Sequence, residues 1–488
     1  MEHTWQVYKP ETAPFIADAG RLFAGAGHNS AGEGLPFSEN LLTFARDKPS
    51  DMDIQQLYKL YEAHPMITTD SRDCRPGSIF LALKGASFDG NLFARSALEK
   101  GCSYAIVDSS EAVVKGDSRY ILADDCLKTF KLLAREHRRR HPVPVIAITG
   151  TNGKTTTKEL IAAVLSRRFN VLFTEGNFNN DVGVPKTLFR LSPEHEMAVV
   201  EMGASHPGDI KTLVETAEPT CGLITNVGRA HLEGFGSFEG VKKTKGELYD
   251  YLASCQGLVF IDRDNADLCE MARQRGIANT VGYGTGEGCN IRGRVVSCSP
   301  FLCFEWTDET LDGKTFAVET HLVGAYNITN MLAAIAVGRH FCIDAQTVSE
   351  ALAAYIPKNN RSQLTATSRN QLIVDAYNAN PTSMLTALKS FAMISAPGKM
   401  AILGDMRELG KASEEEHQSV ADFIASHREE LGEVWLVGHE FMKVSTDLRR
   451  FSTTEEVGEE LRRHPVSSRT ILIKGSNGMR LYQLPELL

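Results

Sequence analysis

A glycine-rich stretch, TGTNGKTTT from Thr149 to Thr157, holds the residues of this chain best suited to chemistry. Glycines let the backbone turn tightly, so that several N–H groups converge on an anion. At this spacing Lys154 reaches the outer phosphates of a nucleotide, and the Thr155 hydroxyl is a ligand for Mg²⁺. The stretch therefore predicts a nucleoside triphosphate site with Mg²⁺, formed by Gly150, Thr151, Asn152, Gly153, Lys154, Thr155 and Thr156.

The elements on either side of this loop must position it. The apolar run 145–148 is typical of a buried parallel strand. The segment after the loop predicts a helix with four apolar residues on one face, Leu160, Ile161, Val164 and Leu165. The helix N-terminus adds partial positive charge. Because Ile148 stands at the first glycine of the usual G-x-x-x-x-G-K-[ST] pattern, an ordinary glycine turn is the alternative. Strand, G-K-T and helix in register favour the phosphate site.

Length and composition restrict the class of protein. A chain of 488 residues predicts about three domains. A hydrophobic fraction of 42% is enough for packed cores, and no apolar run is long enough to span a membrane. The net charge of −9 argues against nucleic acid or an anionic membrane as a partner. Ten scattered cysteines without a C-x-x-C pair, and no secretory signal, predict a reducing, cytoplasmic location.

The chain divides into an extension and three predicted α/β domains. Residues 1–51 are rich in small residues without a period, so we expect an extension outside the catalytic fold, with Met52 as the natural start. Residues 52–138 predict a small α/β domain with strands in GSIFLAL and YAIVD. Residues 139–356 alternate strands and helices like a doubly wound sheet, followed by an antiparallel addition. Residues 357–488 repeat the alternation and predict a Rossmann-like domain.

Further polar residues follow predicted strands, where ligands of open α/β sheets bind. Glu201 ends MAVVE and suits Mg²⁺, whereas His231, after CGLITNVGRA, would be an unusual Mg²⁺ ligand. Lys245 lies on a predicted helix, where lysines are normally solvated. The loop TEGNFNNDVGVP suits hydrogen bonds to a polar substrate, or is a plain turn cluster, through Asn177, Asn179 and Asn180. These residues indicate a multidomain ATP-dependent enzyme and leave a kinase, an ATP-driven switch and a ligase open.

The quoted segments resemble the Mur ligases of peptidoglycan synthesis from about Met52 to the C-terminus. TGTNGKTTT is similar to that family's phosphate loop, Ile148 included, and GNFNNDVGVP, DAYNANPTSM, LGDMRELG and KGSNGMRL are similar to its other motifs. The resemblance implies an ATP-dependent ligase that adds D-Ala-D-Ala to UDP-MurNAc-tripeptide through an acyl phosphate. The products would be UDP-MurNAc-pentapeptide, ADP and phosphate. It also implies a monomer, with a third domain that closes over the nucleotide by a hinge near residues 356–361.

The resemblance assigns roles residue by residue. The first domain would grip the UDP end through Ser71, Arg72, Lys84, Phe88, Asp89 and Gly90, and Asn91 stands where relatives often have His. Thr155, Glu201 and His231 match metal positions. Lys245 matches a carbamylated lysine, whose anionic carbamate helps to hold a second Mg²⁺. Asn330 matches an adenine contact, Asp375 a ribose contact and Arg361 a phosphate contact, while Asn378 and Asn380 lie where the dipeptide enters. Catalysis would rest on Lys154, His231, Lys245 and Arg361.

Two other readings compete with this assignment. Another ligase of the superfamily, such as the enzyme that adds the third residue or a folylpolyglutamate synthase, would share the phosphate loop. The first would carry a D-N-P-[RA] motif, which is absent, and the second would lack TTDSR and ALKGASFDGNLF. A catalytically silent paralogue would have lost key residues, yet Lys154, Glu201, His231 and Lys245 are all present.

Overall fold

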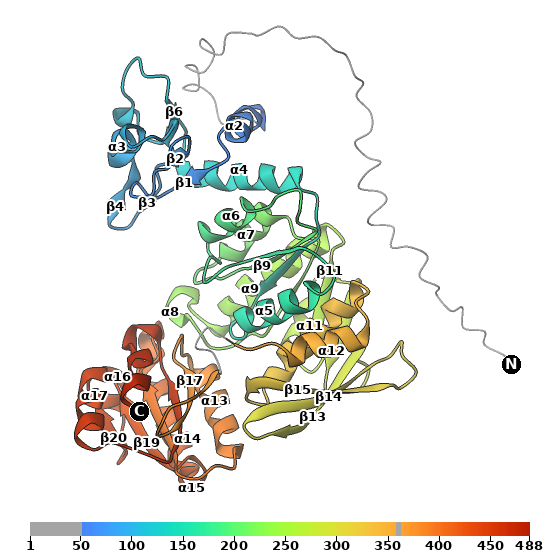
Figure 1. The fold of residues 1–488 in the computed structure, drawn as a ribbon, viewed down its shortest axis with the longest axis vertical. Helices are drawn as coiled ribbons and strands as arrows, with labels where there is room; N and C mark the ends of the chain where they lie inside the picture. Colours follow the sequence, from blue (N-terminus) through green and yellow to red (C-terminus); the bar gives the residue numbers. More distant parts are fainter. Residues whose placement is uncertain (1–50, 358–362) are drawn as a thin grey trace, which may run out of the picture. The chain divides into compact units, whose positions relative to one another are not determined.

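A computed structural model describes residues 51–357 and 363–488 of the chain (Figure 1). The predicted extension, apart from Asp51, therefore lies outside the described residues, as do Arg361 and most of the predicted hinge. The chain separates into two compact units, with the boundary between Pro142 and Val143. Each unit is described by itself below. The limits predicted for the individual domains stay predictions.

The first unit is a small parallel sheet with helices, as the sequence predicts. Its strands follow the order β1 (Ile67–Thr68), β2 (Ile79–Leu81), β5 (Tyr104–Val107) and β6 (Tyr120–Leu122). A short antiparallel pair, β3 (Lys84–Gly85) and β4 (Phe88–Asp89), follows β2. The helices are α2 (Asp51–Ala63), α3 (Ala94–Glu99) and α4 (Cys126–Arg140), with 3₁₀ turns η2 (Gly90–Phe93) and η3 (Ser110–Ala112). Helix α2 packs on α4, where the Tyr58 hydroxyl lies 2.9 Å from His137 Nδ1.

The second unit begins with a nine-stranded sheet that carries the predicted phosphate loop. The strand order is β15 (Thr315–Val323), β14 (Phe301–Asp308), β13 (Ile291–Cys298), β12 (Thr280–Gly284), β11 (Leu258–Asp262), β10 (Cys221–Ile224), β7 (Val145–Thr149), β9 (Met197–Glu201) and β8 (Val171–Phe173). The strands from β8 to β13 are parallel, whereas β13, β14 and β15 pair antiparallel. The predicted antiparallel addition thus continues the main sheet.

Helices pack on this sheet in two groups. One group is α5 (Lys154–Leu165), α11 (Asn327–His340) and α12 (Ala345–Ala353), which contact one another (Figure 1). The other is α6 (Gly183–Leu188), α7 (Asp209–Ala217), α8 (Leu232–Phe235), α9 (Phe238–Ser254) and α10 (Ala266–Gln274). The four residues predicted to share one face of α5 are fully buried. Burial of that face against β7 and α11 fixes where α5 begins, and hence where the phosphate loop ends.

The second unit ends with a six-stranded sheet that confirms the Rossmann-like prediction. Its order is β16 (Gln363–Ala366), β17 (Gln371–Asp375), β21 (Thr470–Lys474), β18 (Lys399–Gly404), β19 (Glu433–Val437) and β20 (Arg449–Phe451), with only β16 antiparallel. Its helices are α13 (Pro381–Met393), α14 (Ser413–Ser426), α15 (Arg428–Leu431), α16 (His439–Lys443) and α17 (Thr454–Arg463), with 3₁₀ turns η4 (Gly410–Ala412), η5 (Asn477–Met479) and η6 (Leu481–Leu487). Apolar clusters cover the sheet on both faces, as buried parallel strands require.

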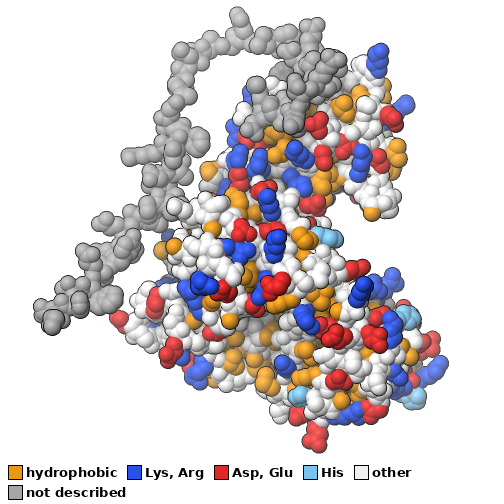
Figure 2. Space-filling model, turned by 180° about the vertical axis from the view of Figure 1, so that it is seen from behind, with side chains coloured by type: hydrophobic (Ala, Val, Ile, Leu, Met, Phe, Trp, Pro, Cys, Tyr) orange, Lys and Arg blue, Asp and Glu red, His pale blue; other side chains and the backbone are white. Residues whose placement is uncertain are grey.

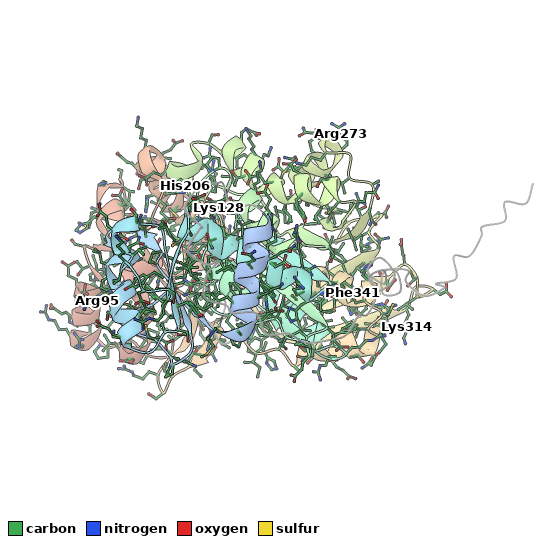
Figure 3. The ribbon with its side chains drawn as sticks, turned by 90° about the horizontal axis from the view of Figure 1, so that it is seen from above. Arg95, Lys128, His206, Arg273, Lys314 and Phe341 are labelled. Atoms are coloured by element: carbon green, nitrogen blue, oxygen red, sulfur yellow. The ribbon has the colours of Figure 1, made fainter. Side chains whose placement is uncertain are left out.

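The surface carries charge of both signs. Figure 2 shows acidic and basic side chains intermixed over the visible face, in keeping with the mild net charge. Arg273, in the last turn of α10, and Lys314, before β15, are exposed and lie at the rim of the ribbon in Figure 3. Within residues 51–357 and 363–488, no helix has both the length and the apolar character needed to cross a bilayer.

Candidate functional site

The phosphate loop joins β7 to α5 and depends on two glycines. Gly150 has φ +142° and Gly153 has φ +79°, backbone angles that residues other than glycine rarely adopt. A Cβ on Gly150 would lie 2.0 Å from Thr225 Oγ1, and a Cβ on Gly153 would lie 2.8 Å from Asn330 Oδ1. Both glycines are therefore required by backbone conformation and by close neighbours. The turn that the sequence predicts is present.

Lys154 lies over this loop. Its Nζ donates to the carbonyl oxygens of Gly150 at 2.8 Å and Thr151 at 3.0 Å. The charge is thus held where an anion bound by the loop N–H groups would meet it. Asn330, on α11, accepts a hydrogen bond from Thr157 Oγ1 at 3.0 Å, beside the loop. Its predicted adenine contact stays a prediction.

Thr155 and Glu201 form a buried pair of oxygen groups beside the loop. Thr155 Oγ1 lies 2.9 Å from Glu201 Oε2 and 3.1 Å from Oε1, and Glu201 is only 1% exposed. Asn179 Nδ2 donates to Glu201 Oε1 at 2.8 Å, and the buried Lys158 Nζ lies 3.8 Å from Oε2. A hydroxyl and a carboxylate in contact are hard oxygen ligands of the kind that Mg²⁺ prefers. This pair fits the predicted metal.

A second set of basic groups lies near Lys154. Burial lowers the pKa of His231, Glu408 opposes that shift, and the charges of Lys154 and Lys245 lower it further. His231 Nδ1 lies 2.5 Å from Glu408 Oε2. Lys245 is 2% exposed, which corrects the expectation of a solvated lysine, because the inner face of α9 packs against β10. Burial and then the charge of Lys154 lower the pKa of Lys245 well below its ordinary value.

The four predicted metal residues are not all in contact with one another. Thr155 and Glu201 touch, whereas His231 contacts Glu408 and Lys245 lies 5.6 Å above the Phe235 ring. Over the described part of the chain, no three His, Cys, Asp or Glu side chains gather in metal-binding proximity. The contact between Thr155 and Glu201 is therefore the part of the predicted metal set that this structure assembles.

The segment after β10 holds the phosphate loop, and the sequence reasoning missed it. Thr225 Oγ1 donates to the Asn152 carbonyl at 2.6 Å. The Asn152 N–H donates to Asn226 Oδ1 at 3.0 Å, and the Thr151 N–H donates to the Asn226 carbonyl at 2.9 Å. These residues directly follow the carboxyl end of a strand beside β7, and that position was the available signal.

The asparagine loop combines two roles. Asn179 supports Glu201, as described above. Asn180 Oδ1 accepts from the Gly183 N–H at 2.8 Å, at the start of α6, so this side chain serves the turn itself. Asn177 is exposed. The plain-turn alternative thus accounts for Asn180, while the substrate contacts predicted for all three stay predictions.

In the C-terminal sheet, the predicted nucleotide and dipeptide residues follow β17. Asp375 Oδ2 lies 2.6 Å from Lys474 Nζ, and Lys474 is 2% exposed. Lys474 Nζ also donates to the Asn378 carbonyl at 3.3 Å. Asn380 begins α13 as its N-cap, and its Nδ2 donates to Asn152 Oδ1 at 2.7 Å. The structure therefore brings a predicted dipeptide residue to the phosphate loop. Lys474 was missed because β21 is remote from β17 in sequence.

In the first unit, Lys84 and Asn91 of the predicted UDP loop contact Asp108, the residue that follows β5. Lys84 Nζ lies 2.8 Å from Asp108 Oδ1, a residue that the sequence reasoning missed. Asn91 is 5% exposed, and its Nδ2 donates to both Asp89 and Asp108. Asn91 thus connects two loops of the fold. Phe88 is 55% exposed, which leaves its ring available to a ligand.

The remaining UDP residues have local partners. Arg72 forms an exposed ion pair with Asp70, with Nη2 2.7 Å from Oδ2. The Ser71 carbonyl accepts from Lys100 Nζ at 2.7 Å. Gly90 is tightly packed, since a Cβ there would lie 2.5 Å from the Leu83 carbonyl oxygen. Only backbone without a side chain fits at Gly90.

Three family models match this chain along its length. They are the Mur ligase family catalytic domain over residues 65–144, the Mur ligase middle domain over 148–338 and the Mur ligase glutamate ligase domain over 360–477. The chain belongs to the Mur ligase family, which confirms the resemblance seen in the sequence.

The individual relatives and solved structures similar to this chain carry the names of Mur ligases. A UDP-N-acetylmuramoyl-tripeptide–D-alanyl-D-alanine ligase of Synechocystis is 37% identical over 72% of this chain and 75% of its own length. The ligase of the same name from Escherichia coli is 35% identical over 78% of this chain and 82% of its own length. The crystal structure of MurF from Acinetobacter baumannii matches with a TM-score of 0.80 at 28% identity, over 89% of this chain and 97% of that one. MurF ligase from Thermotoga maritima, in complex with ADP, matches with a TM-score of 0.77 at 27% identity, over 87% and 97%.

Proposed function

We propose that this protein is an ATP-dependent ligase that joins D-Ala-D-Ala to UDP-MurNAc-tripeptide during synthesis of the peptidoglycan precursor. The observation that carries the proposal is the phosphate loop, with Lys154 over its backbone and the Thr155–Glu201 pair beside it. This site lies in a chain whose relatives, matched over 75% and 82% of their own lengths, bear the name of that reaction. The proposed products are UDP-MurNAc-pentapeptide, ADP and phosphate.

The chemistry requires positive charge at the loop. The tripeptide carboxylate attacks the γ-phosphate of ATP to give an acyl phosphate and ADP, and two anions must therefore meet. Lys154 lies at the loop, with its Nζ over the backbone that would hold the phosphates. Such a fixed cation stabilises negative charge that develops on the transferring phosphoryl group. We assign Arg361, which lies outside the described residues, to the same task. The amine of D-Ala-D-Ala then attacks the acyl carbon, and phosphate leaves.

Thr155 and Glu201 are the residues proposed to hold Mg²⁺, with His231 and Lys245 as further metal residues. When bound, Mg²⁺ neutralises phosphate charge and orients the nucleotide. The fit of Thr155 and Glu201 rests on two buried oxygen groups in contact. Asn179 orients Glu201 by donating to Oε1 at 2.8 Å.

Carbamylation of Lys245 is the finer part of the proposal. Lys245 is 2% exposed, and burial lowers its pKa well below the ordinary value, although the charges of Asp209 and Glu247 oppose the shift. A buried cation is costly, whereas reaction of the neutral amine with CO₂ gives an anion beside Lys154. In ¹³C-bicarbonate, we expect a carbamate resonance from the wild type and none from Lys245→Ala. Lys243→Ala, on the exposed side of the same helix, should keep the signal.

The other domains are proposed to bind the two substrates and to keep water away from the acyl phosphate. The UDP end is proposed to bind the first unit around Lys84 and Phe88, and the dipeptide the segment Asn378–Asn380. Asp375 and Asn330 are proposed to contact the nucleotide ribose and adenine. Because an acyl phosphate hydrolyses readily, closure of the C-terminal domain over the loop would protect it. We also propose that the enzyme is a monomer and acts in the cytoplasm.

Phosphate release tests the proposed function. ATP and Mg²⁺ would be supplied with UDP-MurNAc-tripeptide, with D-Ala-D-Ala, and with both. Release that needs both substrates, with a UDP-MurNAc-pentapeptide product by mass, supports the proposal. Release with the tripeptide and another amine would keep ligase chemistry but change the acceptor, as for the third-residue enzyme. No release from a folded protein would favour a silent paralogue, and turnover by Lys154→Ala equal to wild type would contradict the assignment of the loop.

A further inference from the structure

The segment between β10 and α8, residues 225–231, touches both the phosphate loop and the C-terminal sheet domain. We call it the bridging segment. Toward the loop, Asn226 Oδ1 accepts from the Asn152 N–H at 3.0 Å, and the Gly228 N–H donates to Thr151 Oγ1 at 2.9 Å. The segment is fixed directly to the loop, because these hydrogen bonds join main-chain N–H groups to short side chains.

Toward the C-terminal domain, the bridging segment makes an ion pair and a close backbone contact. Arg229 Nη1 lies 2.6 Å from Glu416 Oε1, on α14. The Arg229 N–H donates to Thr382 Oγ1 at 3.2 Å, in the first turn of α13. At Gly228, a Cβ would lie 2.9 Å from the same Thr382 Oγ1, so the two domains meet here without room for a side chain.

The ion pair has one buried and one exposed partner. The Glu416 side chain is 8% exposed, whereas that of Arg229 is 59% exposed. Arg229 is the only partner that the described residues offer to the Glu416 carboxylate. Loss of Arg229 leaves a largely buried carboxylate without its counter-charge, so the contact between the domains is weakened.

We infer that Arg229 is a positioning residue, which holds the C-terminal domain at the phosphate loop through its ion pair with Glu416. The inference rests on the proposed function for its kinetic consequence, because the dipeptide is assigned to Asn378–Asn380 on that domain. Arg229 and Glu416 are 187 residues apart in the sequence, and their ion pair joins the bridging segment to α14. The separation of these two parts would set how closely D-Ala-D-Ala approaches the nucleotide at the loop. Arg229 would act through the position of the C-terminal domain, which it contacts at Thr382 and Glu416.

The test is a double-mutant cycle with Arg229→Gln, Glu416→Gln and the double variant. Arg294→Gln is the matched control, since Arg294 pairs with Glu305 at 2.6 Å across two strands of one domain. For each protein, small-angle scattering gives the radius of gyration, and initial rates give KM for all three substrates. Thermal unfolding checks that each variant is folded.

We expect Arg229→Gln to increase the radius of gyration and to raise KM for D-Ala-D-Ala about fivefold, at the upper end for a charge pair with one exposed partner. KM for UDP-MurNAc-tripeptide, assigned to the first unit, should not change. The double variant should be no worse than Glu416→Gln, because one interaction is lost in both. A merely structural role would not raise KM for D-Ala-D-Ala while leaving KM for UDP-MurNAc-tripeptide unchanged. Arg229→Lys keeps the charge, so its KM for D-Ala-D-Ala should lie between those of the wild type and Arg229→Gln.

The inference would be overturned if Arg229→Gln and Arg294→Gln had the same radius of gyration and the same KM values. It would also be overturned if the effects of Arg229→Gln and Glu416→Gln added in the double variant. If the wild type proved inactive, the proposed function would fail by itself. Scattering would then decide the inference, since an unchanged radius of gyration would refute it and an increase would support it.

Discussion

Replacement of Lys474 by Met tests whether a buried ion pair holds the predicted ribose residue. Lys474 Nζ lies 2.6 Å from Asp375 Oδ2 and 3.3 Å from the Asn378 carbonyl, and its side chain is 2% exposed. Removal of one partner of a buried pair costs about 3–5 kcal/mol. Because the Asp375 side chain keeps 18% exposure, water relieves part of this cost, and we expect the low end, about 3 kcal/mol.

Hydrogen exchange measured by mass spectrometry locates this loss within a protein of several domains. A loss of about 3 kcal/mol should speed exchange of the β17 and β21 amides by about 150-fold. The double variant Lys474→Met/Asp375→Asn removes both charges and should recover about 2 kcal/mol. KM for ATP should rise in the single variant, because Asp375 loses the group that orients it.

An exposed pair in the same domain is the control. Lys443 lies 2.6 Å from Glu440, but the Lys443 side chain is 53% exposed. Lys443→Met should change exchange little, since solvent replaces an exposed partner. If Lys474→Met exchanged no faster than Lys443→Met in β17 and β21, the buried pair would not stabilise this sheet and the reasoning would be refuted.

Three other changes test the remaining sites. Gly153→Ala adds a Cβ 2.8 Å from Asn330 Oδ1 at φ +79°, so ADP affinity by calorimetry should fall at least about tenfold, and unchanged affinity would contradict the loop geometry. Glu201→Gln should raise the Mg²⁺ concentration for half-maximal activity by about tenfold or more, and equal Mg²⁺ dependence would remove Glu201 from the metal set. Burial would raise the pKa of Asp108, but hydrogen bonds from Lys84 and other donors outweigh it and lower that pKa. Stability of the first unit from this carboxylate is therefore present above its ordinary pKa of 3.8 and lost as pH falls through the lowered value. Acid unfolding with the same pH dependence in Asp108→Asn would refute that origin.

Much of the fold was predictable from local pattern. The apolar runs that predict strands in MAVVEM, CGLITNV, QLIVDAY and TILIKG all form strands, because buried parallel strands need continuous apolar residues. The loop between β7 and α5 was predictable as well, since Gly150 and Gly153 meet a backbone requirement that lies within a few residues. The burial of Lys245 was also open to prediction, since Lys245 lies four residues after Val241 and four before Tyr249, on the apolar face of α9, and the general rule that lysines are solvated misled the prediction.

The sequence by itself determined which residues form the phosphate loop and that strands and helices alternate around it. Only the tertiary structure decided the partners: Asn226 supports Asn152, Glu201 contacts Thr155, and Lys474 holds Asp375. Strand order is the physical reason. In the order β10-β7-β9, the loops at the carboxyl ends of strands far apart in sequence become neighbours. Spacing along the chain does not encode that order, which follows from how the apolar faces of all elements pack together.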